Sequence, residues 1–130
     1  MVIYDWIPLP EPRRLTEAEQ WVLDRLVAHA NCAELSAQAA SVWATAVCDC
    51  GCSSILLQTD APAISAEMML RLSTIGRDDW FSIDYTRWTP MLQVVVHVTL
   101  GSLHELEIFA GEGVPVDIPS AGELYPITIN

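Results

Sequence analysis

The stretch that decides the fold is Met91-Leu-Gln-Val-Val-Val-His-Val-Thr-Leu100, which Gly101-Ser102 separates from Leu103-His-Glu-Leu-Glu-Ile-Phe-Ala110. Two alternating apolar runs around a glycine dipeptide are typical of antiparallel strands joined by a tight turn. Glycine in the first loop position favours a type II′ turn. The four valines would populate both faces, which predicts a central strand buried on both sides. Glu105 and Glu107 place the following strand nearer an edge or a solvated face.

Trp80–Trp88 also predicts a strand, because apolar and polar residues alternate along it. A period of two puts three apolar side chains on the face expected to meet the core: Phe81, Ile83 and Tyr85.

Val42–Cys48 and Ser53–Thr59 predict a further hairpin around Asp49-Cys50-Gly51, with Gly51 in the left-handed conformation that a three-residue loop needs. This register pairs Cys48 with Cys52, Ala46 with Ser54, and Ala44 with Leu56. The core side of the ribbon is then expected to carry Trp43, Val47, Ile55 and Leu57.

Helices are predicted mainly before these strands. Thr16-Glu17-Ala18-Glu19 has the form of a capping box, and apolar residues recur at helical spacing as far as Ala30. Ala33–Ala40 contains good helix formers and predicts a short second helix. Ser65–Leu72 fits either a helix that begins at Ser65 or a packed loop.

The fold class that follows is α+β, with N-terminal helices packed on an antiparallel sheet of about five strands. In 130 residues, 52% hydrophobic content is enough for one core, so residues 15–130 are expected to form a single domain. Three prolines predict that residues 1–14 form an extended arm. Its expected anchors are Ile3, Tyr4, Trp6 and Ile7.

The chain carries 17 acidic residues against six arginines and no lysine, which gives a net charge of −11. Binding to nucleic acid needs clustered cations, so nucleic acid and anionic membranes are excluded as expected partners. An acidic surface favours a basic protein partner. The sequence shows no targeting signal and no apolar run of about 20 residues, which predicts a cytoplasmic protein with reduced thiols.

The cysteines at 48, 50 and 52 form the most distinctive local motif, C-x-C-x-C. Tetrahedral zinc sites usually use pairs of C-x-x-C or cysteine and histidine ligands, so the C-x-C-x-C spacing favours structural packing over metal binding. A fourth ligand would have to come from elsewhere, such as Cys32 or a histidine. A reversible Cys48–Cys52 disulfide is the other alternative.

Elsewhere in the chain, residues that could act in catalysis or metal binding form no strong motif. The turn at Gly101-Ser102 would make His97 and His104 diagonal neighbours, which allows a proton switch or a metal pair but fits two half-buried structural histidines better. Asp78-Asp79 and Asp84 could form a carboxylate pair for acid–base work, although acids that flank a strand are usually solvated. No nucleophile elbow, P-loop, dinucleotide motif or zincin motif is present, so we expect no enzyme and no cofactor.

The outward face of Trp80–Trp88 presents tryptophans among acidic and polar residues, which is typical of a binding surface. The alternative is that both tryptophans pack beneath a helix. The predicted partner-binding residues are Asp78, Asp79, Trp80, Asp84 and Trp88, together with Glu105 and Glu107.

In the motifs Cys48-Asp-Cys-Gly-Cys-Ser-Ser-Ile55 and Gly101-Ser-Leu-His-Glu-Leu-Glu-Ile108, the chain resembles small uncharacterised bacterial proteins that share a C-x-C-G-C turn and a late G-x-L-x-x-L-E-[IV] strand. The resemblance covers roughly residues 15–126 and implies no activity. By type alone, the chain is also similar to the acidic immunity proteins of bacterial toxin–immunity pairs.

The leading hypothesis is therefore an acidic, non-enzymatic binding protein, most concretely an immunity protein that neutralises a basic toxin domain. The alternative is a small metal- or redox-responsive protein that uses Cys48, Cys50 and Cys52. A third hypothesis, an enzyme with a dispersed site, requires a deep pocket with converging polar groups.

Overall fold

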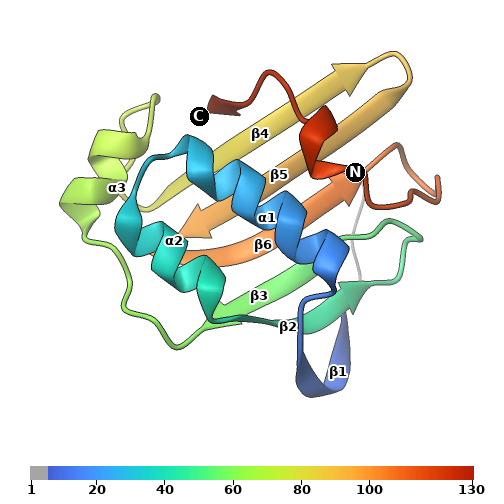
Figure 1. Ribbon diagram of the computed structural model, residues 1–130, viewed down its shortest axis with the longest axis horizontal. Coiled ribbons are helices and arrows are strands. Elements are labelled where there is room, and N and C mark those ends of the chain that lie inside the picture. Colours follow the sequence, from blue (N-terminus) through green and yellow to red (C-terminus); the bar gives the residue numbers. More distant parts are fainter. Residues whose placement is uncertain (1–5) are drawn as a thin grey trace.

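A seven-stranded antiparallel sheet covered on one face by two helices forms the molecule, as a computed structural model of residues 6–130 shows (Figure 1). The strands are ordered β1-β2-β3-β6-β5-β4-β7. They span Trp6–Arg14 (β1), Val42–Cys48 (β2), Ile55–Thr59 (β3), Trp80–Trp88 (β4), Met91–Thr99 (β5), Ser102–Phe109 (β6) and Thr128–Ile129 (β7). The helices are Glu17–His29 (α1), Ala33–Ala40 (α2), Ala66–Leu72 (α3) and the short 3₁₀ helix Ala121–Glu123 (η1).

The α+β class is confirmed, but the expectation of about five strands and only N-terminal helices is wrong. The two extra strands lie at the edges of the sheet. β1 contains three prolines, which an edge strand tolerates because one side of its backbone needs no partner. β7 has two residues, too few to leave a periodic signal. Ser65 accepts a hydrogen bond from the Met68 amide and begins α3, so the helical alternative for that segment is the correct one.

Residues 6–14, predicted as part of an arm, pair with β2 as strand β1. Trp6 is half-buried and Ile7 is exposed, whereas Ile3 and Tyr4 lie outside the described residues. Arg13 in β1 bonds both carboxylate oxygens of Glu19 in the first turn of α1, at 2.8 and 3.1 Å. The predicted capping box of α1 is present, because Thr16 and Glu19 each accept the other's backbone N–H.

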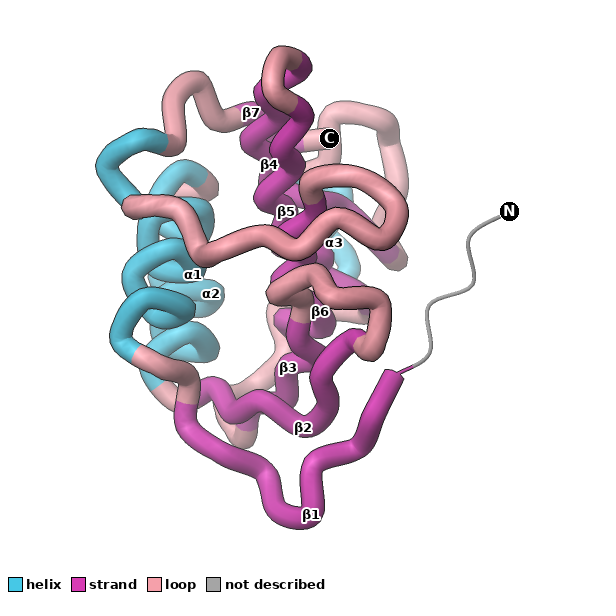
Figure 2. The backbone as a smooth tube through the Cα atoms, turned by 90° about the vertical axis from the view of Figure 1, so that its right-hand side faces the viewer, coloured by secondary structure: helices cyan, strands magenta, loops and turns pink. Residues whose placement is uncertain are grey.

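The core lies between α1, α2 and the face of the sheet turned toward them (Figure 2). Phe81, Ile83 and Tyr85 are all buried on that face, as the alternation of β4 predicts. The expected burial of β5 on both faces holds only in part: its core face is buried, whereas on the outer face Val95 is buried and Gln93 and His97 are half-buried. β6 lies inside the sheet rather than at an edge, and Glu105 and Glu107 are half-buried on its outer face.

Gln38 is a buried polar residue that pattern analysis did not single out. It belongs to α2 and is fully inaccessible. Its side-chain amide donates to the carbonyls of Pro62 and Gly101 at 3.0 and 2.8 Å, and its carbonyl accepts the Leu103 amide at 2.9 Å. One side chain therefore fastens α2 to the β5–β6 turn.

The predicted type II′ turn is wrong. The two loop residues are Leu100 and Gly101, both with positive φ (50° and 86°), and Thr99 pairs with Ser102. Positive φ at both loop positions is the pattern of a type I′ turn. A bulge then shifts the register, so that His97 pairs with Glu105. His104 is exposed, and the predicted His97–His104 pair does not form.

The β2–β3 hairpin also departs from its predicted register. Ala44 pairs with Leu57 and Ala46 with Leu56, because a bulge lies between the two alanines. The extra residue reverses the faces of β2, so Val42 and Ala44 enter the core. Trp43 is not on the core side as expected; it packs against the Arg14 guanidinium, 4.0 Å from its ring centroid. Val47, Ile55 and Leu57 do contact the core.

Candidate functional site

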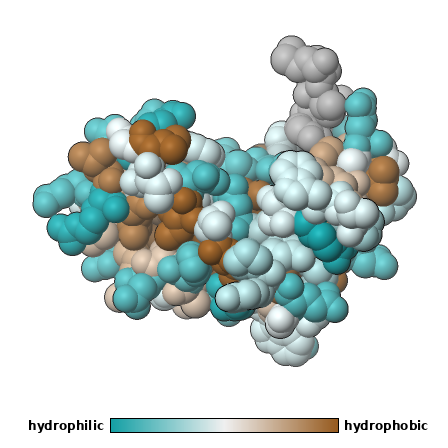
Figure 3. All heavy atoms as spheres, turned by 90° about the horizontal axis from the view of Figure 1, so that it is seen from above, coloured by the Kyte–Doolittle hydropathy of each residue, from teal (hydrophilic) through white to brown (hydrophobic). Residues whose placement is uncertain are grey.

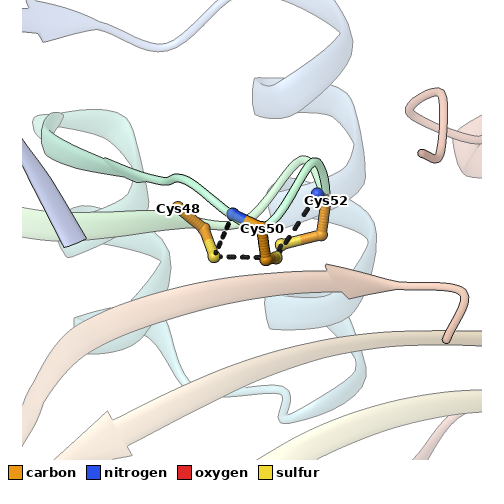
Figure 4. A group of neighbouring side chains, drawn as sticks. All are labelled: Cys48, Cys50 and Cys52. Atoms are coloured by element: carbon orange, nitrogen blue, oxygen red, sulfur yellow. Dashed lines mark hydrogen bonds between the residues drawn. The ribbon is translucent and has the colours of Figure 1, made fainter. Parts of the chain in front are cut away.

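Three cysteine sulfurs converge in the turn that follows β2 (Figure 4). The Sγ atom of Cys50 lies 2.9 Å from that of Cys48 and 2.9 Å from that of Cys52. All three sulfurs lie within 4.8 Å of one another. Alternate positions of the turn thus direct their side chains to one point. The predicted pairing of Cys48 with Cys52 is wrong, because the Cys48 amide bonds the Ser54 carbonyl instead.

Backbone amides in the turn point at the sulfurs. The N–H of Cys50 donates to Cys48 Sγ at 3.5 Å, and the N–H of Cys52 donates to Cys50 Sγ at 3.4 Å. Gly51 has a φ of 93°, a left-handed conformation that glycine adopts without strain and that folds the chain back over the sulfurs. Such amide contacts stabilise a thiolate more than a thiol.

The turn is fastened to β6 and to the segment after it. Ser53 donates its hydroxyl to the Val116 carbonyl at 2.6 Å. The Ser54 hydroxyl accepts the Ile108 amide at 2.9 Å and a hydrogen bond from Cys52 Sγ at 3.2 Å. These bonds hold the three thiols in place before any ligand binds.

The thiols differ in acidity. Burial, followed by the hydrogen bond with Cys50, raises the pKa of Cys48 to about 12. Burial also acts to raise the pKa of Cys50, but its hydrogen bonds with Cys48, Cys52 and two backbone amides outweigh burial and lower that pKa. Cys50, at the centre of the cluster, is therefore more acidic than Cys48.

Cys32, the fourth cysteine, is remote from the cluster. It occupies the N-cap position of α2 without a side-chain capping bond, is buried in the core between helices and sheet, and donates to Glu34 at 3.3 Å. Cys48 is buried too, but it faces away from that core and borders a crevice with Glu105 and Glu107 on the outer face. The sequence-based suggestion of Cys32 as a fourth ligand is not supported.

A second group of polar side chains lies on the outer face of the sheet. His97 Nε2 is 2.9 Å from a Glu107 carboxylate oxygen, and the Trp80 indole N–H donates to His97 Nδ1 at 3.2 Å. Glu105 lies opposite His97 in the register. Donor atoms of His97, Glu105 and Glu107 all lie within 4.8 Å of one another, which is close enough for a shared metal ion.

The hydrogen bond from the Trp80 indole to His97 disfavours a metal ion at this second group. An indole nitrogen can only donate, so Nδ1 of His97 must present its lone pair and the neutral ring carries its proton on Nε2. A metal on Nε2 would move that proton to Nδ1, where it would face the Trp80 N–H. The arrangement instead fits a hydrogen-bond chain from the Trp80 indole through the neutral His97 ring to the Glu107 carboxylate.

Charges surrounding His97 favour its protonated form. Burial acts to lower the pKa of His97, but the hydrogen bond with Glu107 and the charges of Glu105, Glu107 and Asp84 together raise it. Burial is the main cause of a raised pKa at Glu105. The sequence predicts His104 as a diagonal neighbour of His97, whereas the bulge in β6 makes Trp80 and Glu107 its partners.

Most of the predicted partner-binding residues lie on the outer face of the sheet, where Trp80, Glu105 and Glu107 surround His97. Asp79 forms an ion pair with Arg77 at 2.9 Å, and Asp78 is exposed beside it. Trp80 is bound to His97, and Asp84 accepts the Asn130 side-chain amide at 2.7 Å. Trp88 stands apart at the far end of β4 with its side chain 75% exposed.

Exposed apolar side chains are spread over the surface. Figure 3 shows hydrophobic residues gathered toward the end of the molecule that holds α3, where Leu70 and Ile75 are exposed. A groove of about 730 Å³ runs beside Arg14, Trp21 and Asp24, and no residue of either polar group lines it. The crevice beside Cys48 measures only about 10 Å³, too small for a substrate. Trp80 of the second polar group borders an open groove of about 470 Å³ together with Arg77 and Leu100.

No family model, no curated protein and no solved structure matches this chain. Within the described residues, no helix has both the length and the apolar character needed to cross a membrane. Function must therefore be inferred from the two polar groups and from the surface.

Proposed function

We propose that the protein binds a thiophilic metal ion through Cys48, Cys50 and Cys52. The observation that supports this most strongly is the convergence of three sulfurs within 4.8 Å of one another. Thiolate ligands select Zn²⁺, Cu⁺ and similar soft or borderline ions over Mg²⁺ and Ca²⁺.

The surroundings of the thiols favour a ligand set over simple packing. Cysteines that serve as small apolar residues lie among apolar side chains, whereas these sulfurs contact one another and two backbone amides. A disulfide would use two of the thiols and leave the third without an equivalent partner. A single metal ion engages all three.

Metal titration tests the proposal directly. Protein purified without chelator should carry or take up one equivalent of Zn²⁺, and Cys50→Ser should weaken binding by roughly 100-fold or more, since a thiolate ligand is lost. Cys32→Ser is the matched control and should bind as the unmodified protein does. Less than about a tenth of an equivalent bound, with every thiol free to react, would rule out a metal site.

A second function, binding of a basic protein partner such as a toxin domain, is favoured by one observation. Trp88 exposes 75% of its surface on a chain with a net charge of −11 and no lysine. Tryptophans at the centre of interfaces contribute strongly to affinity, and complementary charge accelerates association at low salt.

Two substitutions in β4 separate this function from folding. Trp88→Ala should change stability by less than about 0.5 kcal/mol, as exposed substitutions do, and should weaken neutralisation of a toxin encoded beside this gene. Phe81→Ala should instead destabilise the fold by roughly 3–5 kcal/mol, because its side chain is fully buried. Unchanged toxin neutralisation by the Trp88→Ala variant would exclude Trp88 from the interface.

A further inference from the structure

We infer, on the basis of the proposed metal site, that the bound metal ion has only three protein ligands. A thiol from outside the chain fills its fourth coordination position. The site would then accept or pass on a metal by ligand exchange, rather than serve as a structural staple. The thiol is either a small-molecule thiol or a cysteine of another protein; the coordination chemistry is the same for both.

Among residues 6–130, the three cysteines acquire no fourth ligand. No histidine nitrogen or carboxylate oxygen of that part of the chain joins them within 4.8 Å. Cys32 is buried on the opposite side of the sheet, and His97 is bound to Trp80 and Glu107. Structural zinc sites are closed by four protein ligands, whereas sites with three keep a position for an exchangeable ligand.

Ser54 offers a further oxygen donor beside Cys52, but its hydroxyl is already used. It lies 3.2 Å from Cys52 Sγ, and it accepts the Ile108 amide at 2.9 Å. The residue is buried, so turning the hydroxyl toward a metal would leave that amide without its bond. Ser54 therefore positions Cys52 rather than completing the site.

The fourth position faces solvent. Asp49 and Gly51 at the tip of the turn are exposed, and Cys50 and Cys52 are half-exposed. A Cβ atom built on Gly51 would meet nothing within 4 Å. Because Cys50 and Cys52 are themselves half-exposed, a ligand from solution can approach the cluster.

The donor set indicates the class of the incoming ligand. Three thiolates supply much negative charge to the metal, which makes it a weak activator of bound water and a poor partner for hard oxygen ligands; sulfur is the preferred fourth donor for soft ions. In the exchange, a metal–sulfur bond forms, bound water leaves, and the thiol proton passes to solvent. No electron is transferred.

Cobalt substitution tests the inference. The Co²⁺ form of the whole chain should show sulfur-to-cobalt charge-transfer absorption, which glutathione or a cysteine-containing peptide should raise by about one third as a fourth sulfur joins three. The d–d absorption bands should shift until the added thiol saturates the site. The cobalt should remain bound to the protein through gel filtration. A response to glutathione alone identifies a small thiol as the ligand, and a response to the peptide alone identifies a protein cysteine. The corresponding serine peptide should have no effect.

Asp49→Asn is the matched control, because its exposed carboxylate is the closest in sequence to the three thiols. The starting spectrum of that variant should equal that of the unmodified protein. Bound cobalt whose spectrum no thiol changes, or a spectrum altered by Asp49→Asn, would mean that the chain closes its own site; the inference would then fail while metal binding stands. Absence of cobalt binding would overturn the proposed function itself.

Discussion

Gln38 illustrates how much of this fold depends on single polar side chains. Replacing it with leucine would remove both donor bonds to the Pro62 and Gly101 carbonyls and leave the buried Leu103 amide without an acceptor. We expect a loss of roughly 3 kcal/mol in the free energy of unfolding, measured with urea. Gln58→Leu, at an exposed position of β3, should cost less than about 0.5 kcal/mol. Equal losses in the two variants would contradict this role.

His97 provides a prediction about pH. Trp80→Phe should raise the pKa of His97 further, because the indole donor bonds only an unprotonated Nδ1; Glu107→Gln should lower it by removing a carboxylate. Trp88→Phe, at the exposed end of the same strand, should leave it unchanged. The titration of the His97 ring protons by NMR measures all three. A fall in the Trp80→Phe variant would refute the assigned hydrogen bond.

The raised pKa of His97 also sets a direction for stability. A group with a folded-state pKa above its ordinary value of 6.5 stabilises the fold fully below that value, and the contribution is lost as the pH rises through the raised pKa. The pKa of Glu105 is also raised, so its contribution to stability is likewise lost as the pH rises, over a lower pH range than that of His97. None of this was predictable from the sequence, since the bulge that brings Glu105 opposite His97 leaves no periodic signal.

At the scale of elements, the sequence predicts what local chemistry specifies. The capping box located α1, the alternation in Trp80–Trp88 located β4, and its three core residues were identified correctly. Strand register was predicted less well. Both hairpins contain a bulge, and a one-residue slip reverses every following side chain, so Trp43 was assigned to the wrong face. The sulfur cluster was visible as a motif, but its geometry depended on that same register.

The β5–β6 turn carries an element-scale prediction. A Cβ on Gly101 would overlap the Ile64 carbonyl, and the residue has a φ of 86°. Gly101→Ala should therefore cost about 3 kcal/mol of unfolding free energy, from backbone strain and overpacking together. Gly76→Ala has a similar φ of 73° but open space around the new Cβ, so it should cost only about 1 kcal/mol. Thermal or urea unfolding compares the two variants. A loss of unfolding free energy in Gly76→Ala as large as that in Gly101→Ala would show that the overlap with the Ile64 carbonyl does not contribute.

The whole molecule is shaped by its charge. With 17 acidic residues and six arginines, like charges repel one another across the folded surface, and salt screens that repulsion. The melting temperature should therefore rise between low salt and about 0.5 M NaCl, a range in which the Debye length falls well below 10 Å. A fall in melting temperature would mean that the ion pairs Arg13–Glu19 and Arg77–Asp79 outweigh the general repulsion.

The pairing of β3 with β6 gives the sheet a seam. Only Ile55 with Leu106 and Leu56 with Glu105 register across it, whereas β4 and β5 pair along nine residues. Two half-sheets, β1-β2-β3 and β6-β5-β4-β7, meet along this line. Their pairing joins residues that are far apart in the sequence, so we expect the β3–β6 pairing to form last during folding and to open first. Amide hydrogen exchange should be faster for Leu56 than for Val96. The cysteine turn spans one end of the seam through Ser53 and Ser54, so a bound metal ion would act as a clasp, slowing exchange at Leu56 and leaving Val96 unaffected.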